Sequence, residues 1–89
     1  MTAELLRQLI KASTSVGANT EEACEAQSPK DEASKLGIAL KEVRESHYWL
    51  RLLKMRVGPE NNPDHLIQEA QELCNIFKSR IRKLQSQNH

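Results

Sequence analysis

Three pairs of glutamates are the side chains in this sequence best spaced to bind a metal ion. The pairs are Glu22 with Glu25, Glu42 with Glu45, and Glu69 with Glu72. Residues three apart lie on one face of a helix, so each pair can present two carboxylates to the same point. Carboxylate oxygens suit Mg²⁺, and helical bundles hold metals between such faces. The spacing therefore raises magnesium chemistry as a hypothesis.

The glutamate pattern leaves two interpretations open. Residues 21–25 and 42–45 are similar to the magnesium-binding pattern of all-α nucleoside-triphosphate pyrophosphohydrolases, although that pattern ends in Glu-x-x-Asp and this one in Glu-x-x-Glu. Glu22 and Glu25, however, fall on the polar side of their expected helix, and glutamate is a common helix former on surfaces. We expect solvent-exposed carboxylates and no metal site, and keep a Mg-dependent pyrophosphohydrolase as the alternative function.

Glu42 differs from the other glutamates because it falls among Ile38, Trp49 and Leu53 on an apolar arc. A carboxylate in such a place needs a partner, since burying an unpaired charge costs several kcal/mol. We expect an arginine or Asn19 to hold Glu42 across a helix interface.

Two groups of basic residues could contact the phosphates of RNA or DNA. They are Arg51, Lys54 and Arg56 in one helix, and Lys78, Arg80, Arg82 and Lys83 in the next. In an antiparallel pair of helices the groups lie at opposite ends, so one chain offers no continuous basic stripe. A ring of copies would repeat each group and multiply the phosphate contacts. The simpler interpretation is that these residues offset helix dipoles and nearby acids.

Other chemistry is not visible in the sequence. No Ser/His/Asp or Cys/His arrangement and no glycine-rich phosphate loop occurs. His47 lies between Leu40 and Leu50, which favours an interface histidine over a metal ligand. Cys24 and Cys74 stand fifty positions apart among apolar neighbours, which predicts reduced core cysteines. We expect no catalytic residues, no cofactor and no small-molecule substrate, and hence a protein that is not an enzyme.

Length and composition limit the chain to one small domain over residues 1–89. Thirteen Lys/Arg against twelve Asp/Glu give a formal net charge of +1, so any polyanion site must come from local clustering. No apolar run approaches the roughly 18 residues that cross a bilayer, and no signal-peptide pattern opens the sequence. We expect a soluble, cytoplasmic protein without a membrane partner. With 38% apolar residues the core barely offsets the entropy of ordering, which favours oligomerisation.

Helical periodicity and end signals predict an all-α chain with three helices, over about residues 3–26, 29–57 and 63–85. Ser28 followed by Pro29 and Asp31 marks the clearest helix start. Gly58 and Pro59 mark the clearest stop, with the glycine in a left-handed conformation. Because the connections are short, consecutive helices should be antiparallel, as in an up-down-up bundle.

The middle helix carries two adjoining apolar stripes, more than its two neighbours in the chain can cover. An exposed stripe with a tryptophan is unusual on a soluble monomer, so a further helix should cover it. We expect that helix to come from another copy, completing a four-helix-type bundle by oligomerisation. The predicted interface residues are Ile38, Glu42, Trp49, Leu52 and Leu53.

Three blocks of sequence carry a resemblance to a known family. They are STSVGANTEEACEA (13–26), KLGIALKEVRESHYWLRLL (35–53) and ELCNIFKSRI (72–81). Together they resemble the four-helix-bundle proteins encoded in intervening sequences of bacterial 23S ribosomal RNA genes, with the first helix here matching the family's second.

The resemblance implies an all-α bundle, ring-like oligomers such as pentamers and no established catalytic activity. A related branch is an accessory subunit of reverse transcriptases in diversity-generating retroelements. That branch implies a nucleic acid or a nucleic-acid enzyme as a partner.

Overall fold

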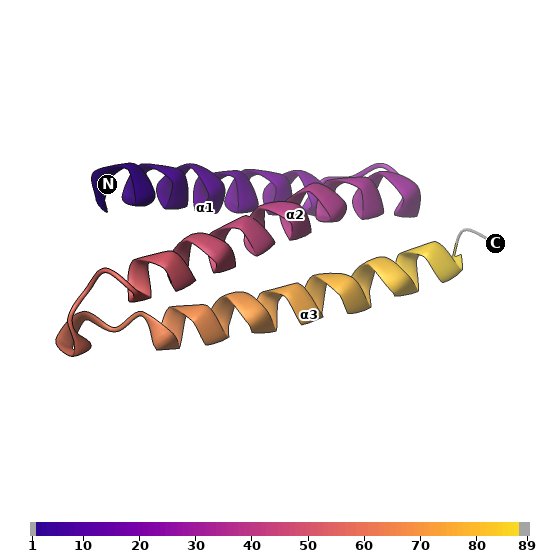
Figure 1. The fold of residues 1–89 in the computed structure, drawn as a ribbon. Helices are drawn as coiled ribbons and strands as arrows, with labels where there is room; N and C mark the ends of the chain where they lie inside the picture. The colour runs from indigo at the N-terminus through magenta and orange to yellow at the C-terminus, as the bar shows by residue number, and fades with distance from the viewer. Residues whose placement is uncertain (1, 88–89) are drawn as a thin grey trace.

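The structure, a computed structural model, describes residues 2–87 as three long helices that run up, down and up (Figure 1). They are α1 (Thr2–Cys24), α2 (Pro29–Lys54) and α3 (Asp64–Gln87), with a short 3₁₀ helix η1 (Pro59–Asn61) between α2 and α3. No strand occurs among these residues. The predicted all-α chain of three helices is confirmed, and each predicted helix boundary lies within three residues of the observed one.

The start of α2 forms as the sequence predicts. Ser28 has extended backbone angles, φ −157° and ψ 162°, and its hydroxyl accepts a hydrogen bond from the Asp31 amide at 3.1 Å. The Asp31 carboxylate accepts in turn from the Gln27 amide at 3.3 Å. The Asp31 amide of the first turn and the Gln27 amide just before the helix are thereby satisfied, and Pro29 has no amide hydrogen to satisfy.

The end of α2 differs from the prediction. The helix stops at Lys54, and the Met55 amide closes it by donating to the Leu52 carbonyl at 3.1 Å. Gly58 has φ −75° and ψ 168°, so it is extended and not left-handed. The reason is Pro59, whose ring disfavours helical angles in the residue before it. Further on, the Asn62 side chain accepts from the Asp64 amide at 3.0 Å, as expected of a helix cap.

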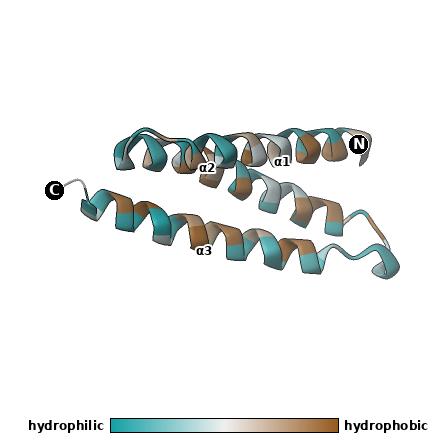
Figure 2. Cartoon of the chain, turned by 180° about the vertical axis from the view of Figure 1, so that it is seen from behind, coloured by the Kyte–Doolittle hydropathy of each residue, from teal (hydrophilic) through white to brown (hydrophobic). Residues whose placement is uncertain are grey.

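The core lies along α2, which packs against α1 on one flank and against α3 on the other. Within residues 2–87, α1 and α3 do not come within 8 Å of each other at any pair of Cα atoms. Figure 2 shows hydrophobic residues recurring turn after turn along α3. The most deeply buried side chains are Ala39, Leu84, Ala12 and Val43. The molecule is therefore an elongated body, 49 × 19 × 14 Å, with α1 and α3 as separate walls.

The two cysteines differ in their surroundings, and one prediction fails. Cys74 is buried, as expected, but Cys24 is exposed; both are free thiols. Ala23, one residue earlier, takes the inward position at the end of α1. Successive residues are rotated by about 100° around the axis of a helix. Cys24 therefore faces away from α2.

Candidate interaction surfaces

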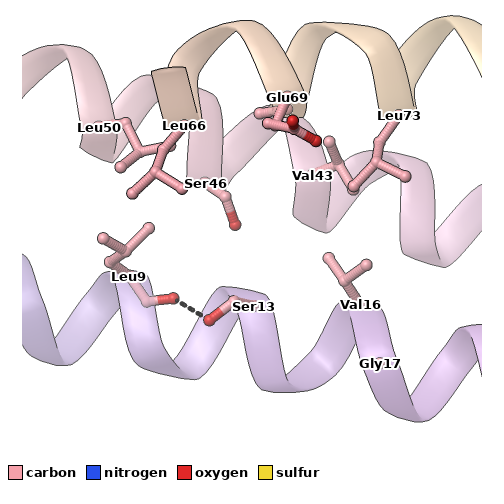
Figure 3. A pocket seen from close by; sticks show the side chains of 11 residues that line it. Leu9, Ser13, Val16, Gly17, Val43, Ser46, Leu50, Leu66, Glu69 and Leu73 are labelled. Carbon is pink, nitrogen blue, oxygen red and sulfur yellow. Dashed lines mark hydrogen bonds between the residues drawn. The ribbon is translucent and has the colours of Figure 1, made fainter. Parts of the chain in front are cut away.

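An apolar groove of about 470 Å³ lies between α1 and α3, with α2 as its floor. Figure 3 shows Leu9 and Val16 of α1 pointing across it toward Leu66, Val43 and Leu73. The lining residues are Leu9, Ser13, Val16, Gly17, Val43, Ser46, Leu50, Leu66, Glu69, Ala70 and Leu73.

The serine hydroxyls of the groove are satisfied within their own helices. The Ser13 hydroxyl donates to the Leu9 carbonyl at 2.8 Å, and the Ser46 hydroxyl donates to the Glu42 carbonyl at 3.0 Å. Neither hydroxyl needs a ligand as an acceptor, so the groove is suited to apolar side chains.

Large apolar side chains stand exposed along both rims of the groove. On α1, Leu6 is 43% exposed and Ile10 is 65% exposed; on α3, Leu66 and Leu73 are 54% and 38% exposed. None of them was predicted from the sequence to lie at an interface. Their spacing was visible, but the gap between α1 and α3 depends on how three helices pack, which the spacing along one helix does not give.

The side chains on the α1 side of the groove change in size along the helix. Leu6, Ile10, Ser13 and Gly17 follow one another at intervals of four, three and four residues, so they form one stripe. A Cβ atom added at Gly17 would meet nothing within 4 Å. The stripe therefore carries large side chains in its first half and small ones in its second half.

The interface predicted on α2 is partly covered by the same chain. Trp49 and Leu52 are half-buried and share a small pocket with Leu5 and Glu4 of α1. Leu53 is also half-buried, whereas Ile38 is 44% exposed. The cover expected from another copy is thus supplied in part by α1, since α1 lies toward this side of α2.

Glu42 is half-buried, but Asn19 does not donate to it as expected. The Asn19 amide nitrogen donates to the Ser15 carbonyl at 3.0 Å and lies 3.3 Å from the Ser15 hydroxyl. Burial raises the pKa of Glu42 above its ordinary value, and a hydrogen bond with Glu45 raises it further, while Lys41 and Lys11 lower it. The cations near Glu42 are therefore lysines, one from each helix.

The glutamate pairs lie along helix surfaces and interact with separate neighbours. The Glu22 carboxylate lies 3.8 Å from the Lys35 ammonium, and the Glu69 carboxylate lies 3.4 Å from the His65 ring. Across residues 2–87, no three side chains of His, Cys, Asp or Glu converge in a way that could hold a metal ion. His47 is half-buried on α2.

Several of the predicted nucleic-acid residues are engaged within the chain. Lys54 forms an ion pair with Asp64 at 2.7 Å, and Arg80 binds both carboxylate oxygens of Glu32 at 2.9 and 3.1 Å. Arg80 donates both hydrogen bonds to Glu32, and these bonds together with the negative charge of Glu32 raise the pKa of Arg80. The two predicted groups lie at opposite ends of the molecule, as expected. Arg51, Arg56, Lys78, Arg82 and Lys83 are exposed.

No helix within residues 2–87 combines the length and the apolar character that crossing a membrane requires.

A search of curated proteins gives no match. Among solved structures, the chain is similar to a protein of unknown function from the S23 ribosomal protein family of Bacteroides thetaiotaomicron, with a TM-score of 0.78 and 37% identity. That match covers 86% of this chain and 72% of the other.

A family model reaches the same conclusion as the resemblance of the three sequence blocks. The model of the 23S rRNA-intervening sequence protein matches residues 2–79, which span α1, α2 and most of α3. The chain therefore belongs to the 23S rRNA-intervening sequence protein family.

Proposed function

We propose that this protein is a cytoplasmic, non-enzymatic helical scaffold that functions by associating with further copies of itself. The observation that carries the proposal is the apolar groove between α1 and α3 with its exposed rims. Soluble monomers rarely expose a continuous apolar patch of this kind, and such patches mark interaction sites. A helix laid into the groove would occupy the fourth position of a four-helix bundle.

The pattern of side-chain sizes on α1 supports a second copy as the occupant. If two copies of α1 run antiparallel about a point between Lys11 and Ala12, Leu6 of one copy faces Gly17 of the other, and Ile10 faces Ser13. Each bulky residue then meets a small one, and the arrangement is reciprocal, as a two-fold interface requires. The open space around Gly17 leaves room for that approach.

The α2 stripe remains a predicted second contact. Its members are Ile38, Glu42, Trp49, Leu52 and Leu53, and Ile38 is the most exposed of its apolar residues. An assembly that is larger than a pair needs a contact beyond the groove. The mass in solution separates the cases, since the groove pairing gives two copies and the ring implied by the family resemblance gives five.

A thermal shift separates the scaffold from the magnesium-dependent pyrophosphohydrolase. A ligand that binds only the folded state raises the midpoint of unfolding. We expect no rise when Mg²⁺ and a nucleoside triphosphate are added together. A clear rise with both, and a smaller one with either, would favour the enzyme.

The proposal is tested by placing one glutamate in each apolar surface. Ile10→Glu charges the groove rim, and Ile38→Glu, the matched control, charges the α2 stripe. Light scattering should give about 10.1 kDa for Ile10→Glu, the mass of one chain, and at least twice that for Ile38→Glu. Helicity by circular dichroism checks that both variants fold. Dissociation by Ile38→Glu alone would assign the interface to α2 and overturn the groove proposal.

A further inference from the structure

A basic face lies along α2 and α3, on the side of the molecule away from the groove. On α2 the stripe of residues 30, 34, 37, 41, 44, 48, 51 and 55 follows helical spacing of four and three. On α3 the corresponding stripe is residues 71, 78, 82 and 85. We define the basic face by its exposed cations, which are Lys30, Lys41, Arg44 and Arg51 of α2, and Lys78 and Arg82 of α3.

The two stripes adjoin each other. Lys30 and Ser34 of α2 share a shallow polar depression with Gln85 of α3. Gln85 stands seven residues after Lys78, so the two residues share one edge of α3. That edge is opposite the one that carries Leu66 and Leu73 toward the groove. The cations of both helices therefore belong to one surface, so a single chain offers a continuous basic stripe, contrary to the expectation from the two end groups alone.

The basic face is free of acidic residues along both stripes. None of the twelve positions in the two stripes is Asp or Glu. Two carboxylates lie nearby: Glu42 is on the α1 side of α2, where Lys11 affects its pKa, and the exposed Glu45, which shares a hydrogen bond with Glu42, borders the basic face. A chain with a formal net charge of +1 thus collects six positive charges on one surface. From Lys30 to Arg51 this surface extends about 31 Å along α2, at 1.5 Å per residue.

An aromatic ring stands within the basic face. The Tyr48 side chain is 47% exposed, and the Arg51 guanidinium carbon lies 5.8 Å from the centre of its ring. Trp49 meets the same ring edge-on, with centroids 5.1 Å apart, and supports its position. Exposed rings beside cations are the elements with which proteins hold unpaired bases and their phosphates.

We propose that the basic face binds the phosphate backbone of RNA, with Tyr48 stacking on an unpaired base. This proposal does not depend on self-association, since it uses the surface away from the groove. A lipid surface is the less suitable partner, because a helix that binds a membrane places apolar side chains beside its cations. Here the one large aliphatic side chain among the positions of the two stripes is Met55, at the end of α2, whereas the exposed leucines and isoleucines gather chiefly at the groove, on the other side of the molecule.

The test measures binding of labelled RNA by fluorescence anisotropy at about 50 mM salt, with a single strand and a duplex as separate probes. The variant Lys41→Gln/Arg44→Gln/Arg51→Gln removes three charges from the basic face. The matched control, Arg7→Gln/Lys11→Gln/Lys35→Gln, removes three charges from α1 and from the side of α2 that faces α1. We expect the first variant to bind at least about tenfold more weakly and its salt slope to fall by about two. The control should retain the wild-type slope.

A second arm tests the ring. Tyr48→Leu should weaken binding of the single strand about tenfold and leave the duplex unchanged, because only unpaired bases stack on a side chain. Light scattering of all variants should match the wild type, which separates this test from that of self-association. Equal loss in both triple variants, no binding by the wild-type protein, or binding to phosphatidylglycerol vesicles in place of RNA would overturn the proposal.

Discussion

The groove and the basic face both follow α2 along its length, yet they have opposite chemistry. The groove collects exposed leucine and isoleucine from α1 and α3, whereas the basic face collects lysine and arginine from α2 and α3. Their difference shows that overall composition is a poor guide to this molecule, since a net charge of +1 conceals a surface with six cations. Under the two proposals, one side joins copies and the other remains free for a polyanion.

The largest expected effect comes from weakening the packing on which both surfaces depend. Leu84 is 1% exposed in the core, and α3 supplies one wall of the groove as well as Lys78 and Arg82. Leu84→Ala should lower the free energy of unfolding by about 3 kcal/mol, through lost burial and the cavity left behind. Urea unfolding at a fixed protein concentration measures this. A loss below about 1 kcal/mol would mean that α3 is not held by this core.

Salt should separate the two surfaces. Raising the salt from about 50 to about 200 mM should weaken RNA binding about a hundredfold, since several phosphate contacts release counterions. Association through the groove should be unaffected, because apolar burial is not screened. Anisotropy and light scattering on the same samples measure both quantities. A mass that falls with added salt would show that charges, and not the groove, hold the copies together.

Replacing a glycine by alanine on each of the two surfaces should change the stability by a smaller amount. Gly17 in the groove and Gly37 on the basic face both lie within helices, and a Cβ added at either would meet nothing within 4 Å in one chain. Alanine should therefore raise stability by about 1 kcal/mol at Gly37. At Gly17 the gain should be smaller or negative, because the proposed second copy approaches there. Equal gains in thermal unfolding would indicate that nothing covers the groove.

The smallest effect concerns Glu42, which lies between the two surfaces on the α1 side of α2. Burial and the neighbouring Glu45 raise its pKa in the folded state, so its charged form opposes folding. The contribution of Glu42 to stability is present below its ordinary pKa and is lost as pH rises through the raised value. Glu42→Gln should therefore stabilise the protein at neutral pH, and the gain should vanish in acid. A gain that does not change with pH would contradict this.

Local features of the fold were predictable from the sequence, and features that depend on three helices together were not. Ser28 and Pro29 predicted the start of α2 because a helix cap involves only adjacent residues. Gly58 was misjudged because Pro59 imposes extended angles on it, and Cys24 because a single residue decides which way a helix end faces.

The candidate surfaces were harder to predict for a related reason. Helical spacing predicted a surplus of apolar residues on α2, and an interface there stays a prediction. The structure shows that α1 shields Trp49 and Leu52 in part and that the more exposed residues line the groove. The spacing along one helix gives its faces, whereas the gap between α1 and α3 depends on the packing of both against α2.

The mass of the unmodified chain in solution, followed by light scattering over a range of concentrations, is the most direct measurement. If a second copy fills the groove, the mass will be a multiple of 10.1 kDa that falls toward one chain only on dilution. A mass of 10.1 kDa at every concentration would show that the groove stays uncovered by copies of this chain and would contradict the account.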